Sequence, residues 1–564
     1  MCGIYGIVGK TNVRNVISSL KKLEYRGYDS CGLAYLYRNK SYLIKTSGNT
    51  NKLVENINNR NIDIAVGHTR WATHGSISPI NAHPHTTSNN NFFVVHNGVI
   101  ENYLEIINKH KFNMTSETDT EVIPHLLDEY TNSMSVIDAI KVIMHELIGS
   151  FAVVFLSKKD NKLYFFKVKS PLLIAINSEK VILASDNCVF EAGMNVTILN
   201  DYNYGYVENN NYCIFSFREN EKWNTFYKDT DSINKKINEY YMLDEIKYQP
   251  DMILTISKKY SSISTKDFLS LINESNELVF IGAGSSYFVS SLLAKIYETK
   301  LRKRCISVVA SEISFFNPVY KKTAFIFLSQ SGETADICDA MYLVKSKGYK
   351  IVSICNNVNS SLGYNSDMIF PIFANQEVSV AATKSFTAML YVGMILLDKQ
   401  IINNRLLYCN EIEDTLMKWE YINNISDEIL NMKNIFYIGK GIDYICAEEG
   451  ALKLREISYL SCYSFQSGEL KHGSIAMIDK NSICIALLTD QNYSRLVKSN
   501  LEELKSRGAK VYLISNCDKA CDICLCGGVF SLVVCLQIIA YQVALKLKRN
   551  IDQPRNLAKS VTVQ

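Results

Sequence analysis

Two different patterns of apolar and polar positions follow one another along the chain. Up to residue 218, short apolar runs of strand length, such as SFAVVFL and KLYFFKV, are separated by turn residues. Few helices interrupt these runs, and the candidates lie at 13–24, 101–110, 119–130 and 135–147. This arrangement predicts an antiparallel α+β domain.

Beyond residue 240 the pattern changes to apolar strands that each run into a glycine turn and a helix. This alternation is typical of a parallel α/β sheet. LVFIGAGSSYFV (278–289) and IFYIGKGIDYIC (435–446) match at an offset of 157 residues, and KSKGYKIVSI (345–354) matches KSRGAKVYLI (505–514) at an offset of 160. The second half is therefore predicted to contain two copies of one α/β fold.

The changes of pattern also predict domain boundaries. Residues 1–218 form the first domain, and the polar stretch 219–240 is interpreted as a linker. The first α/β copy is expected at 241–405 and the second at 406–551, with a helical stretch near 380–420 joining them. The last residues, 552–564, form a tail that contains one proline.

The composition is that of a folded protein with several domains. The chain has 564 residues and a mass of 64.0 kDa, which is too long for one core. Hydrophobic residues make up 47% and charged residues 21%, which argues against a disordered chain. With 60 Lys and Arg against 56 Asp and Glu, the net charge of +4 gives no reason to expect nucleic acid or a membrane as a partner.

The start of the chain and one apolar stretch indicate whether the protein is secreted or inserted in a membrane. The first residues, MCGIYGIVGK, lack the basic start and long apolar run of a signal peptide, so we expect a cytoplasmic protein with reduced cysteines. Ile523–Leu545 contains no charged residue and is long enough to span a bilayer. Because it carries Gly527, Gly528 and Gln537, we interpret it as a strand end followed by a buried helix.

The first candidate nucleophile is Cys2, which directly follows the initiator methionine. Once that methionine is removed, Cys2 carries a thiol and a free α-amine, and an amine that titrates near ~8 accepts the thiol proton. Taken alone, Cys2 is more simply explained as a small buried residue. Amide hydrolysis also needs oxyanion donors, which Asn97 and Gly98 supply as a side-chain amide and a backbone N–H. Arg70 and Asp119 carry the charges that bind the carboxylate and amine of an amino acid.

Five motifs in this region, CGIYGIVG, LEYRGYDSCG, GHTRWATHG, HNGVIEN and SETDTE, together resemble the class II glutamine amidotransferases. The glutaminase domain of that family has the N-terminal-nucleophile fold, an αββα sandwich. The resemblance implies that Cys2 attacks the glutamine amide and that Asn97 and Gly98 stabilise the oxyanion. The glutamine-binding residues that it implies are Arg70, Trp71, Thr73, His74 and Asp119.

Two hydroxyl-rich loops follow predicted strands of the first α/β copy. SQSGET (329–334) and IGAGSS (281–286) both place hydroxyls and backbone N–H groups at the start of a helix, where phosphate binds. A Ser-rich helix cap is the simpler reading of one such loop, but two loops at the carboxyl ends of parallel strands indicate a ligand crevice. The second copy has TDQNY (489–493) at the equivalent place, so we expect phosphate in the first copy only.

Acid–base chemistry is predicted in the second copy and in the tail. In the helix EEGALKLREISY, the residues Glu449, Lys453 and Glu456 share one face, although a solvated ion pair has the same spacing. His472 is the only histidine after residue 145 and lies in a polar turn, which favours an exposed, functional side chain. Lys559 could form a Schiff base with a ketose carbonyl, although tails are usually frayed.

These motifs, with YQP, VAATKSFT and DQPRNLAKSVTV, cover essentially the whole chain and resemble the glucosamine-6-phosphate synthase family, the isomerising glutamine–fructose-6-phosphate aminotransferases. In that family a glutaminase domain precedes two sugar isomerase (SIS) domains with parallel sheets. The resemblance implies that glutamine and fructose 6-phosphate yield glutamate and glucosamine 6-phosphate, the first step of amino-sugar (UDP-GlcNAc) biosynthesis, without a cofactor. The sugar-phosphate-binding residues that it implies are Ser285, Ser286, Ser329, Gln330, Ser331, Thr334, Val380 and Ala382.

The same resemblance implies the catalytic roles in the second half. Lys559 forms the ketose imine, and Glu456 moves a proton between C1 and C2 with the assistance of Lys453. His472 assists ring opening from the partner subunit of a homodimer, and Trp71 gates an internal channel for ammonia. A dry channel would keep ammonia unprotonated and prevent its loss to water.

The chain departs from the family pattern away from these catalytic positions. Ala382 stands where we expect Ser, which removes one hydroxyl contact to the sugar phosphate. IGAGSS lacks an expected Cys, SEISFFNP (311–318) lacks an expected Arg, and the chain is somewhat shorter than bacterial members. Two other functions stay open at this point, a glutaminase with an uncoupled sugar site and a non-enzymatic sugar-phosphate sensor.

Four cysteines crowd into ten residues near the end of the second copy, at Cys517, Cys521, Cys524 and Cys526. Structural zinc sites usually pair two close cysteine knuckles across a longer loop, whereas CDICLC reads as a strand. We therefore expect no metal. Gly282-x-Gly284 lacks the third glycine and the acidic residue of a dinucleotide-binding unit, so NAD is not expected either.

Overall fold

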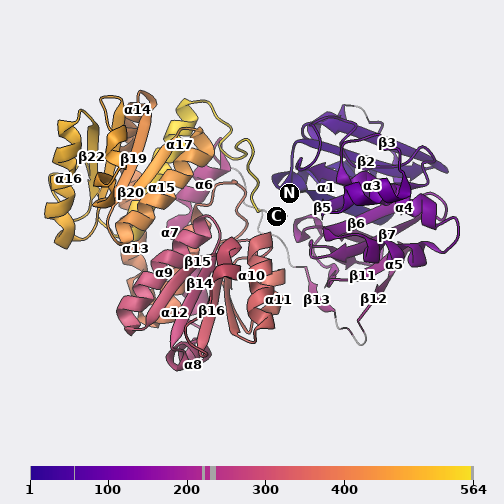
Figure 1. Ribbon diagram of the computed structural model, residues 1–564, viewed down its shortest axis with the longest axis horizontal. Helices are drawn as coiled ribbons and strands as arrows, with labels where there is room; N and C mark the ends of the chain where they lie inside the picture. Colours follow the sequence, from indigo (N-terminus) through magenta and orange to yellow (C-terminus); the bar gives the residue numbers. More distant parts are fainter. Residues whose placement is uncertain (1, 56, 219–220, 222, 229–236, 561–564) are drawn as a thin grey trace. The chain divides into compact units, whose positions relative to one another are not determined.

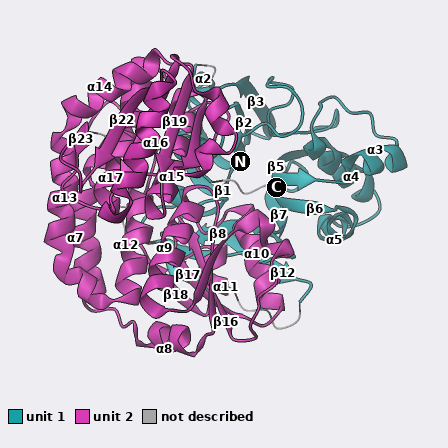
Figure 2. Cartoon of the chain, turned by 60° about the vertical axis from the view of Figure 1, so that its left-hand side comes forward, with its two compact units in different colours: residues 1–232, 560–564 teal, residues 233–559 magenta. Residues whose placement is uncertain are grey.

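The computed structural model describes residues 2–55, 57–218, 221, 223–228 and 237–560. Its contacts divide the chain into two compact units, residues 1–232 with 560–564 and residues 233–559 (Figure 2). Within the predicted linker 219–240, residues 219–220, 222 and 229–236 lie outside the described residues. The boundary predicted at residue 405 stays a prediction.

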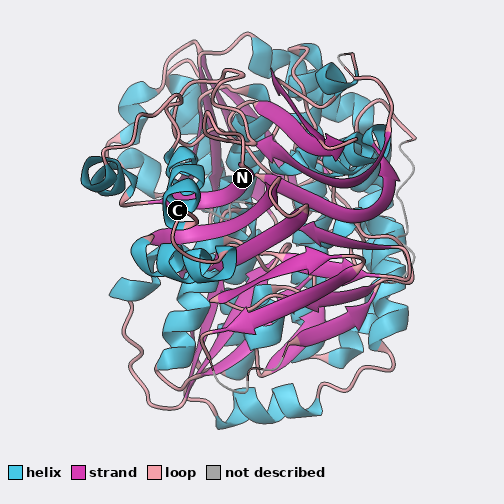
Figure 3. Ribbon diagram, turned by 90° about the vertical axis from the view of Figure 1, so that its right-hand side faces the viewer, coloured by secondary structure: helices cyan, strands magenta, loops and turns pink. Residues whose placement is uncertain are grey.

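The first unit contains two antiparallel sheets; several of their strands are labelled in Figure 1, and strands are coloured magenta in Figure 3. In spatial order, the eight-stranded sheet consists of β13 (Asn224–Tyr227), β10 (Asn195–Ile198), β8 (Leu173–Ile176), β9 (Lys180–Ala184), β1 (Gly3–Asn12), β4 (Asn61–Arg70), β2 (Ser30–Tyr37) and β3 (Lys40–Ser47). The five-stranded sheet consists of β12 (Asn211–Ser216), β11 (Asn203–Glu208), β7 (Lys162–Val168), β6 (Gly149–Ser157) and β5 (Phe92–Ile100).

Side-chain alternation along the strands stacks these sheets into four layers. Ile4 and Val8 of β1 pack against apolar residues of the five-stranded sheet, whereas Tyr5 and Ile7 point to the opposite face and pack with helix α1. The far face of the five-stranded sheet is covered by α4 and α5. The helices of this unit are α1 (Val13–Leu23), α2 (Asn51–Val54), α3 (Tyr103–His110), α4 (Val122–Tyr130) and α5 (Val136–Glu146). The predicted αββα sandwich is confirmed.

Five strands of the first unit were missed in the sequence: β3, β10, β11, β12 and β13. β3 and β12 are edge strands in which every residue is exposed or half-buried, so they lack the apolar runs that mark the other strands. β13 falls within the predicted linker and pairs with β10 along four residues. This part of the linker assignment is corrected: polar flanks concealed the short alternation Asn-Thr-Phe-Tyr, of which Phe226 packs against the core.

The second unit contains two parallel sheets of five strands with the same order. The first sheet consists of β15 (Arg304–Val309), β14 (Glu277–Gly282), β16 (Thr323–Ser329), β17 (Lys350–Cys355) and β18 (Met368–Pro371). The second consists of β20 (Cys462–Gln466), β19 (Asn434–Gly439), β21 (Ser482–Leu488), β22 (Lys510–Ser515) and β23 (Ile523–Cys524). The matching order confirms the predicted duplication.

Helices of this unit surround the two sheets (Figure 1). They are α6 (Tyr241–Lys247), α7 (Gln249–Tyr260), α8 (Lys266–Glu274), α9 (Ser285–Leu301), α10 (Ala335–Ser346), α11 (Ser361–Asn365), α12 (Lys384–Leu397), α13 (Arg405–Met417), α14 (Trp419–Leu430), α15 (Ile442–Ser458), α16 (Ser494–Ser506) and α17 (Val529–Lys546). One continuous apolar core includes residues of α9, α12, α15, α17 and both sheets. α17 is the one described helix that is long and apolar enough to cross a membrane, but 83% of that stretch is buried inside the unit. The predicted buried helix is confirmed.

Candidate active sites

The first site is built around Cys2, at the start of β1. β1 pairs with β4 so that Gly3 lies opposite Thr69, which brings Cys2 to the end of β4. There the Cys2 Sγ lies 3.3 Å from the Trp71 backbone N and 3.6 Å from the Trp71 carbonyl oxygen. Burial raises the pKa of the Cys2 thiol, while the Trp71 N–H and Arg70 oppose that rise. The thiol therefore needs a proton acceptor to become a nucleophile.

The predicted oxyanion donors lie beside Cys2. Asn97, on β5, donates its Nδ2 to the Cys2 carbonyl oxygen at 2.9 Å, and its Oδ1 lies 3.0 Å from His68 Nε2. This second contact fixes which end of the amide faces Cys2. Gly98 has φ +131°, and a Cβ there would lie 1.8 Å from the Ser150 carbonyl oxygen, so a side chain is excluded.

The predicted glutamine-binding residues converge on the same small pocket. The Arg70 guanidinium is buried and donates to the backbone carbonyls of His74, Gly75 and Ser76. Asp119 accepts the Ile100 N–H at 2.8 Å. The pocket is lined by Cys2, Arg70, Trp71, Thr73, His74, His83, His96, Gly98, Thr118, Asp119 and Thr120. Each of the predicted residues except Asn97 is among these, and Asn97 contacts Cys2 directly.

Sequence reasoning missed a group of buried histidines behind this pocket. His68 stacks on His83 with ring centroids 4.1 Å apart, and His83 lies edge-on to His85 at 4.8 Å. His96 contacts Thr120 through Nδ1 at 2.9 Å. Burial lowers the pKa of His68 to about 3, so its ring is neutral where it contacts Asn97. The spacing H-x-H in NAHPHT was the available signal.

The second site begins at the carboxyl ends of β14 and β16, which are neighbouring parallel strands. The Ser329 hydroxyl accepts the Gly332 N–H at 2.9 Å, and the Ser331 hydroxyl accepts the Glu333 N–H at 3.2 Å. Gly332 has φ +68°, which a side chain rarely adopts, so the loop turns sharply there. Thr334 follows as the N-cap of α10, and Gln330 lies half-buried within the loop. The predicted phosphate loop is thus a tight turn at a helix start.

The two serines of IGAGSS point in different directions. Ser286 is half-buried on the first turn of α9, where its hydroxyl contacts the Met389 sulfur at 3.7 Å. Ser285 instead donates to Glu449 Oε1 of α15 at 3.1 Å and is buried. The Ser285 hydroxyl therefore joins α9 to α15, because the first turn of α9 faces that helix. The sequence predicted that Ser285 faces the phosphate loop, and this prediction is wrong.

The predicted acidic and basic face of α15 is buried rather than solvated. Lys453 Nζ lies 3.7 Å from Glu449 Oε1 and 2.5 Å from Glu456 Oε2, and both Lys453 and Glu449 are almost fully buried. Burial raises the pKa of Glu449 to about 8. Burial opposes the charge of Lys453, but the two glutamates raise its pKa. A charged lysine thus holds the Glu456 carboxylate in place.

The tail is anchored to the unit and carries Lys559 into it. Asp552 accepts the N–H groups of Tyr241 and Met242 at the start of α6, both at 2.9 Å. The Asp552 carbonyl oxygen accepts the Val380 N–H at 3.0 Å, which ties the tail to the segment of Val380 and the half-buried Ala382.

Lys559 forms a buried ion pair with Glu377. Glu377 was missed in the sequence because a single acidic residue in NQEVSVAATK carries no periodic signal.

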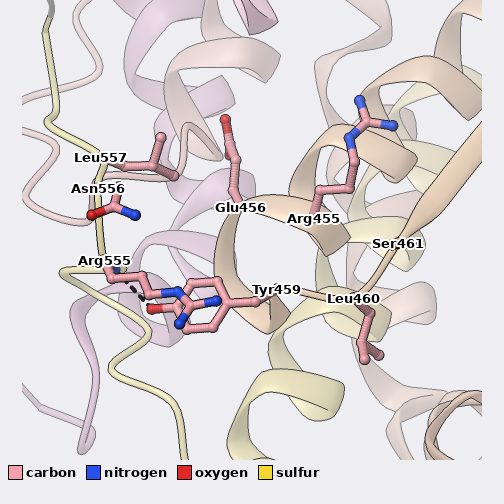
Figure 4. Close-up of a pocket in the computed structure, with 8 residues that line it drawn as sticks. All are labelled: Arg455, Glu456, Tyr459, Leu460, Ser461, Arg555, Asn556 and Leu557. Carbon is pink, nitrogen blue, oxygen red and sulfur yellow. Dashed lines mark hydrogen bonds between the residues drawn. The ribbon is translucent and has the colours of Figure 1, made fainter.

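A pocket separates the end of α15 from the tail (Figure 4). It is lined by Arg455, Glu456, Tyr459, Leu460, Ser461, Arg555, Asn556 and Leu557. The Arg555 guanidinium lies over the Tyr459 ring at 4.4 Å, and its backbone N–H donates to the Tyr459 hydroxyl. His472 is exposed at the end of a short 3₁₀ turn and does not line this pocket.

The four cysteines do not converge on one point, although the Cys524 Sγ lies 4.0 Å from the Cys521 carbonyl oxygen. The Cys517 Sγ faces the Leu488 carbonyl oxygen at 3.7 Å, whereas the Cys526 Sγ lies 3.8 Å from Lys418 Nζ. β23 includes Cys524 but ends there. Within the part of the chain that the structure describes, no group of three or more His, Cys, Asp or Glu residues is placed to bind a metal ion.

Two protein-family models match the chain. One, described as a SIS domain, matches residues 271–399 and 428–520, and the other, described as a glutamine amidotransferase domain, matches residues 68–192. The fold and the two sites therefore define a protein that joins a glutamine amidotransferase domain to SIS domains.

Relatives match the chain over its full length. The Bacillus cereus protein named glutamine–fructose-6-phosphate aminotransferase (isomerizing) is 35% identical over 606 residues, and its namesake from Streptococcus agalactiae is 34% identical over 617 residues. Both alignments cover 100% of each chain. The chain belongs to the family of glutamine–fructose-6-phosphate aminotransferases (isomerizing).

Solved structures resemble the second unit. The C-terminal domain of glucosamine-fructose-6-phosphate aminotransferase from Francisella tularensis is 30% identical, with a TM-score of 0.52, and the match covers 57% of this chain and 99% of that one. The tagatose-6-phosphate ketose/aldose isomerase from Escherichia coli has a TM-score of 0.51 at 18% identity, with 56% and 96% covered. The second likeness shows a shared fold.

Proposed function

We propose that this protein converts glutamine and fructose 6-phosphate into glutamate and glucosamine 6-phosphate. The observation that carries the proposal is the pairing, in one chain, of the Cys2–Asn97 pocket with the Lys453–Glu456 pair and the buried Lys559. The Cys2–Asn97 pocket alone would fit a glutaminase, and the sugar site alone would fit a sugar-phosphate sensor. Full-length relatives with this printed name support the assignment.

The first half-reaction releases ammonia. After removal of the initiator methionine, the α-amine of Cys2 takes the thiol proton, and the thiolate attacks the glutamine amide carbon. Asn97 Nδ2 and the Gly98 N–H stabilise the oxyanion, while Arg70 and Asp119 bind the substrate carboxylate and amine. The C–N bond breaks as ammonia leaves with a proton, and water hydrolyses the thioester to glutamate. Thr73, His74 and Trp71 complete the pocket wall.

The second half-reaction makes the amino sugar. Ser286, Ser329, Gln330, Ser331 and Thr334 bind the phosphate at the helix starts, and Val380 and Ala382 line the same site. Lys559 forms an imine at C2 of the open ketose, and ammonia replaces the lysine.

Isomerisation follows at the face of α15. Glu456, held by Lys453, then moves a proton from C1 to C2, which converts the ketose imine into the aldose amine.

Three finer points belong to the same proposal. Trp71 gates a channel that keeps ammonia out of water between the two sites. The protein is a cytoplasmic homodimer, and the partner subunit's His472 assists ring opening, which accounts for the exposed place of His472 in one chain. The domain boundaries follow the predicted linker, the two α/β copies and the tail.

Product analysis tests the proposal. Purified protein with the initiator methionine removed is incubated with glutamine and fructose 6-phosphate. Equal amounts of glutamate and glucosamine 6-phosphate are expected. Glutamate without amino sugar would leave a glutaminase with an uncoupled sugar site, and turnover of neither substrate would favour a sugar-phosphate sensor.

A further inference from the structure

Four ionisable side chains meet in the interior of the second unit, around Lys559 of the tail. They are Glu245 of α6, Glu377 and Lys384 around the start of α12, and Lys559 of the tail. Glu245 and Glu377 are each 3% exposed, Lys384 is 0% exposed, and the Lys559 side chain is 4% exposed. Buried charges are costly unless each is paired, so this arrangement needs a reason.

Glu377 is fixed by several donors at once. Its Oε1 accepts the backbone N–H groups of Thr383 and Ser385, both at 3.0 Å, and its Oε2 accepts the Ser385 hydroxyl at 2.6 Å. The same Oε2 contacts Lys559 Nζ. Burial alone would raise the pKa of Glu377, but Lys559 and Ser385 hold it at about 2. The carboxylate is therefore an ionised group with a fixed position against the Lys559 nitrogen.

Glu245 is the contrasting carboxyl group. Its Oε1 accepts the Val378 N–H at 2.5 Å, while its Oε2 is buried and has no hydrogen-bond partner among the described residues. Burial and the negative charge of Glu377 raise the pKa of Glu245 to about 8. Near neutral pH one carboxyl of the cluster is thus neutral and the other is charged, and the charged one touches Lys559.

The other charged groups around Glu377 leave Lys559 as its close partner. Lys384 donates its Nζ to the Gln376 carbonyl oxygen at 2.7 Å and lies over the Tyr248 ring. Lys453 also bears on Glu377 through its charge, but its contacts are with Glu449 and Glu456 of α15. Neither lysine forms an ion pair with Glu377 among the described residues.

We propose that Glu377 is a catalytic residue, the counter-ion of the imine that Lys559 forms with the ketose. The inference rests on the proposed function. The ammonium of Lys559 and the ketose carbonyl give a protonated imine and one water. The C–N bond forms, the carbonyl C–O bond breaks, and two of the three Nζ protons leave in that water. The nitrogen attacks only after it has lost one of these protons, because an ammonium has no lone pair, and its positive charge returns when water leaves. Glu377 therefore faces a positively charged nitrogen before and after the step. A protonated imine is the form that ammonia attacks readily.

The experiment is imine trapping at a series of pH values. Wild-type and variant proteins are incubated with fructose 6-phosphate and cyanoborohydride, which reduces the protonated imine, and the adduct on Lys559 is measured by mass spectrometry. Removal of the counter-ion in Glu377→Gln lowers the pKa of the imine, so the protonated form is lost at lower pH. We expect the upper limit of the trapping profile to fall by about 1–3 pH units.

Two variants make the result specific. Glu245→Gln replaces a neutral carboxyl of the same cluster with a neutral amide, so its profile at pH 7 and below should match that of the wild type. Glu377→Asp keeps the negative charge. Its imine should be trapped more slowly, but the upper pH limit of its trapping profile should equal that of the wild type. An unshifted profile in Glu377→Gln, or a shifted one in Glu377→Asp, would overturn the counter-ion role.

The outcomes also separate this inference from the proposed function. Absence of a trapped adduct on Lys559 in the wild type, with glucosamine 6-phosphate still formed, would remove the imine role of Lys559 and the counter-ion with it. Absence of product as well would remove the proposed function itself. Binding of fructose 6-phosphate to Glu377→Gln, measured by calorimetry, checks that the segment of Thr383 and Ser385 is still folded. If Glu377→Gln does not bind fructose 6-phosphate, the test rests on Glu377→Asp: the upper pH limit of its trapping profile should equal that of the wild type.

Discussion

The two parallel sheets of the second unit share one strand order but differ where each first strand meets its helix. Gly284 before α9 has φ +55° and Gly441 before α15 has φ +63°, so both turns have the same backbone. Two residues later the first copy has Ser286 and the second has Asp443. Duplication therefore preserved the frame of an anion site while changing the group that faces it.

In the second copy the side chain of Asp443 supplies a negative charge at the start of α15. The Asp443 carboxylate accepts the Thr489 N–H at 2.8 Å and the Thr489 hydroxyl at 2.5 Å, and Asp443 is buried. A carboxylate at a helix start satisfies the positive end of the helix as a phosphate would. In the first copy Ser286 carries no charge, and under the proposed function a bound phosphate satisfies the start of that helix.

In the helices that follow these turns, α9 and α15, three ionisable residues of the second copy have no ionisable counterpart in the first. At the offset of 157 residues, Glu449, Lys453 and Glu456 of α15 correspond to Leu292, Ile296 and Thr299 of α9. The first copy has no acidic or basic group at these places, and the second has three. Under the proposed function the first copy binds the phosphate and the second copy moves protons.

The largest effect should come from Glu456→Gln. A general acid–base residue contributes about 10²–10⁴-fold, so synthesis of glucosamine 6-phosphate from added ammonia should fall by that factor. Glutamine hydrolysis, which the proposed function assigns to Cys2, should continue. The matched control in the first copy is Thr299→Ala, which removes an exposed hydroxyl bonded to its own helix and should leave synthesis unchanged. Equal rates in the two variants would contradict the division of roles.

A smaller effect is expected from Ser331→Ala in the phosphate loop. Loss of one hydrogen bond to a charged group costs about 1.5–3 kcal/mol, so the KM for fructose 6-phosphate should rise by roughly 10–100-fold with a smaller change in kcat. Gln491→Ala, in the loop of the second copy, changes an exposed residue and serves as the control. A raised KM in the control would mean that both copies bind phosphate.

Asp443→Ala should affect stability rather than binding. The variant leaves the Thr489 N–H and hydroxyl without their acceptor, which should lower the free energy of unfolding by about 1–3 kcal/mol, seen as a lower Tm. The matching change, Ser286→Ala, removes only a weak contact to sulfur and should cost less stability but more affinity for fructose 6-phosphate. The opposite pairing of effects would show that Asp443 is not the internal counterpart of a bound phosphate.

Local sequence patterns predicted most of this architecture. The repeat at 157 residues, the short apolar strands of the first unit and the buried α17 are all marked by apolar residues within one chain segment. The edge strands β3 and β12 were missed because none of their residues is fully buried. For the same reason β13 was hidden in a polar stretch.

The sites divide in the same way. Glu449, Lys453 and Glu456 were found because helical spacing places them on one face, and Asn97 and Gly98 because they are adjacent. Glu377 and Lys559 are separated by 182 residues in the sequence. Their ion pair forms only in the folded chain, so no local sequence pattern predicts it. The direction of Ser285, toward α15, likewise depends on how two helices pack.

The smallest predicted effect concerns Glu449, whose counterpart in α9 is Leu292. Burial raises the pKa of Glu449 from its ordinary value of 4.5 to about 8, so the folded state holds this proton more tightly than the unfolded chain. The contribution of Glu449 to stability is therefore fully present below pH 4.5 and is lost as the pH rises through 8. Glu449→Gln cannot ionise, and its amide still accepts the Ser285 hydroxyl.

The measurement is the Tm between about pH 4 and pH 9. The wild type should lose more stability over this range than Glu449→Gln, with nearly equal values at the acid end, where both side chains are neutral in the folded and in the unfolded chain. Ser285→Ala is the control, because it removes the hydroxyl partner but keeps the ionisable group, so its Tm should fall with pH as steeply as that of the wild type. Parallel curves for the wild type and Glu449→Gln would mean that Lys453 keeps Glu449 ionised. In that case the buried face of α15 would carry two negative charges and one positive charge.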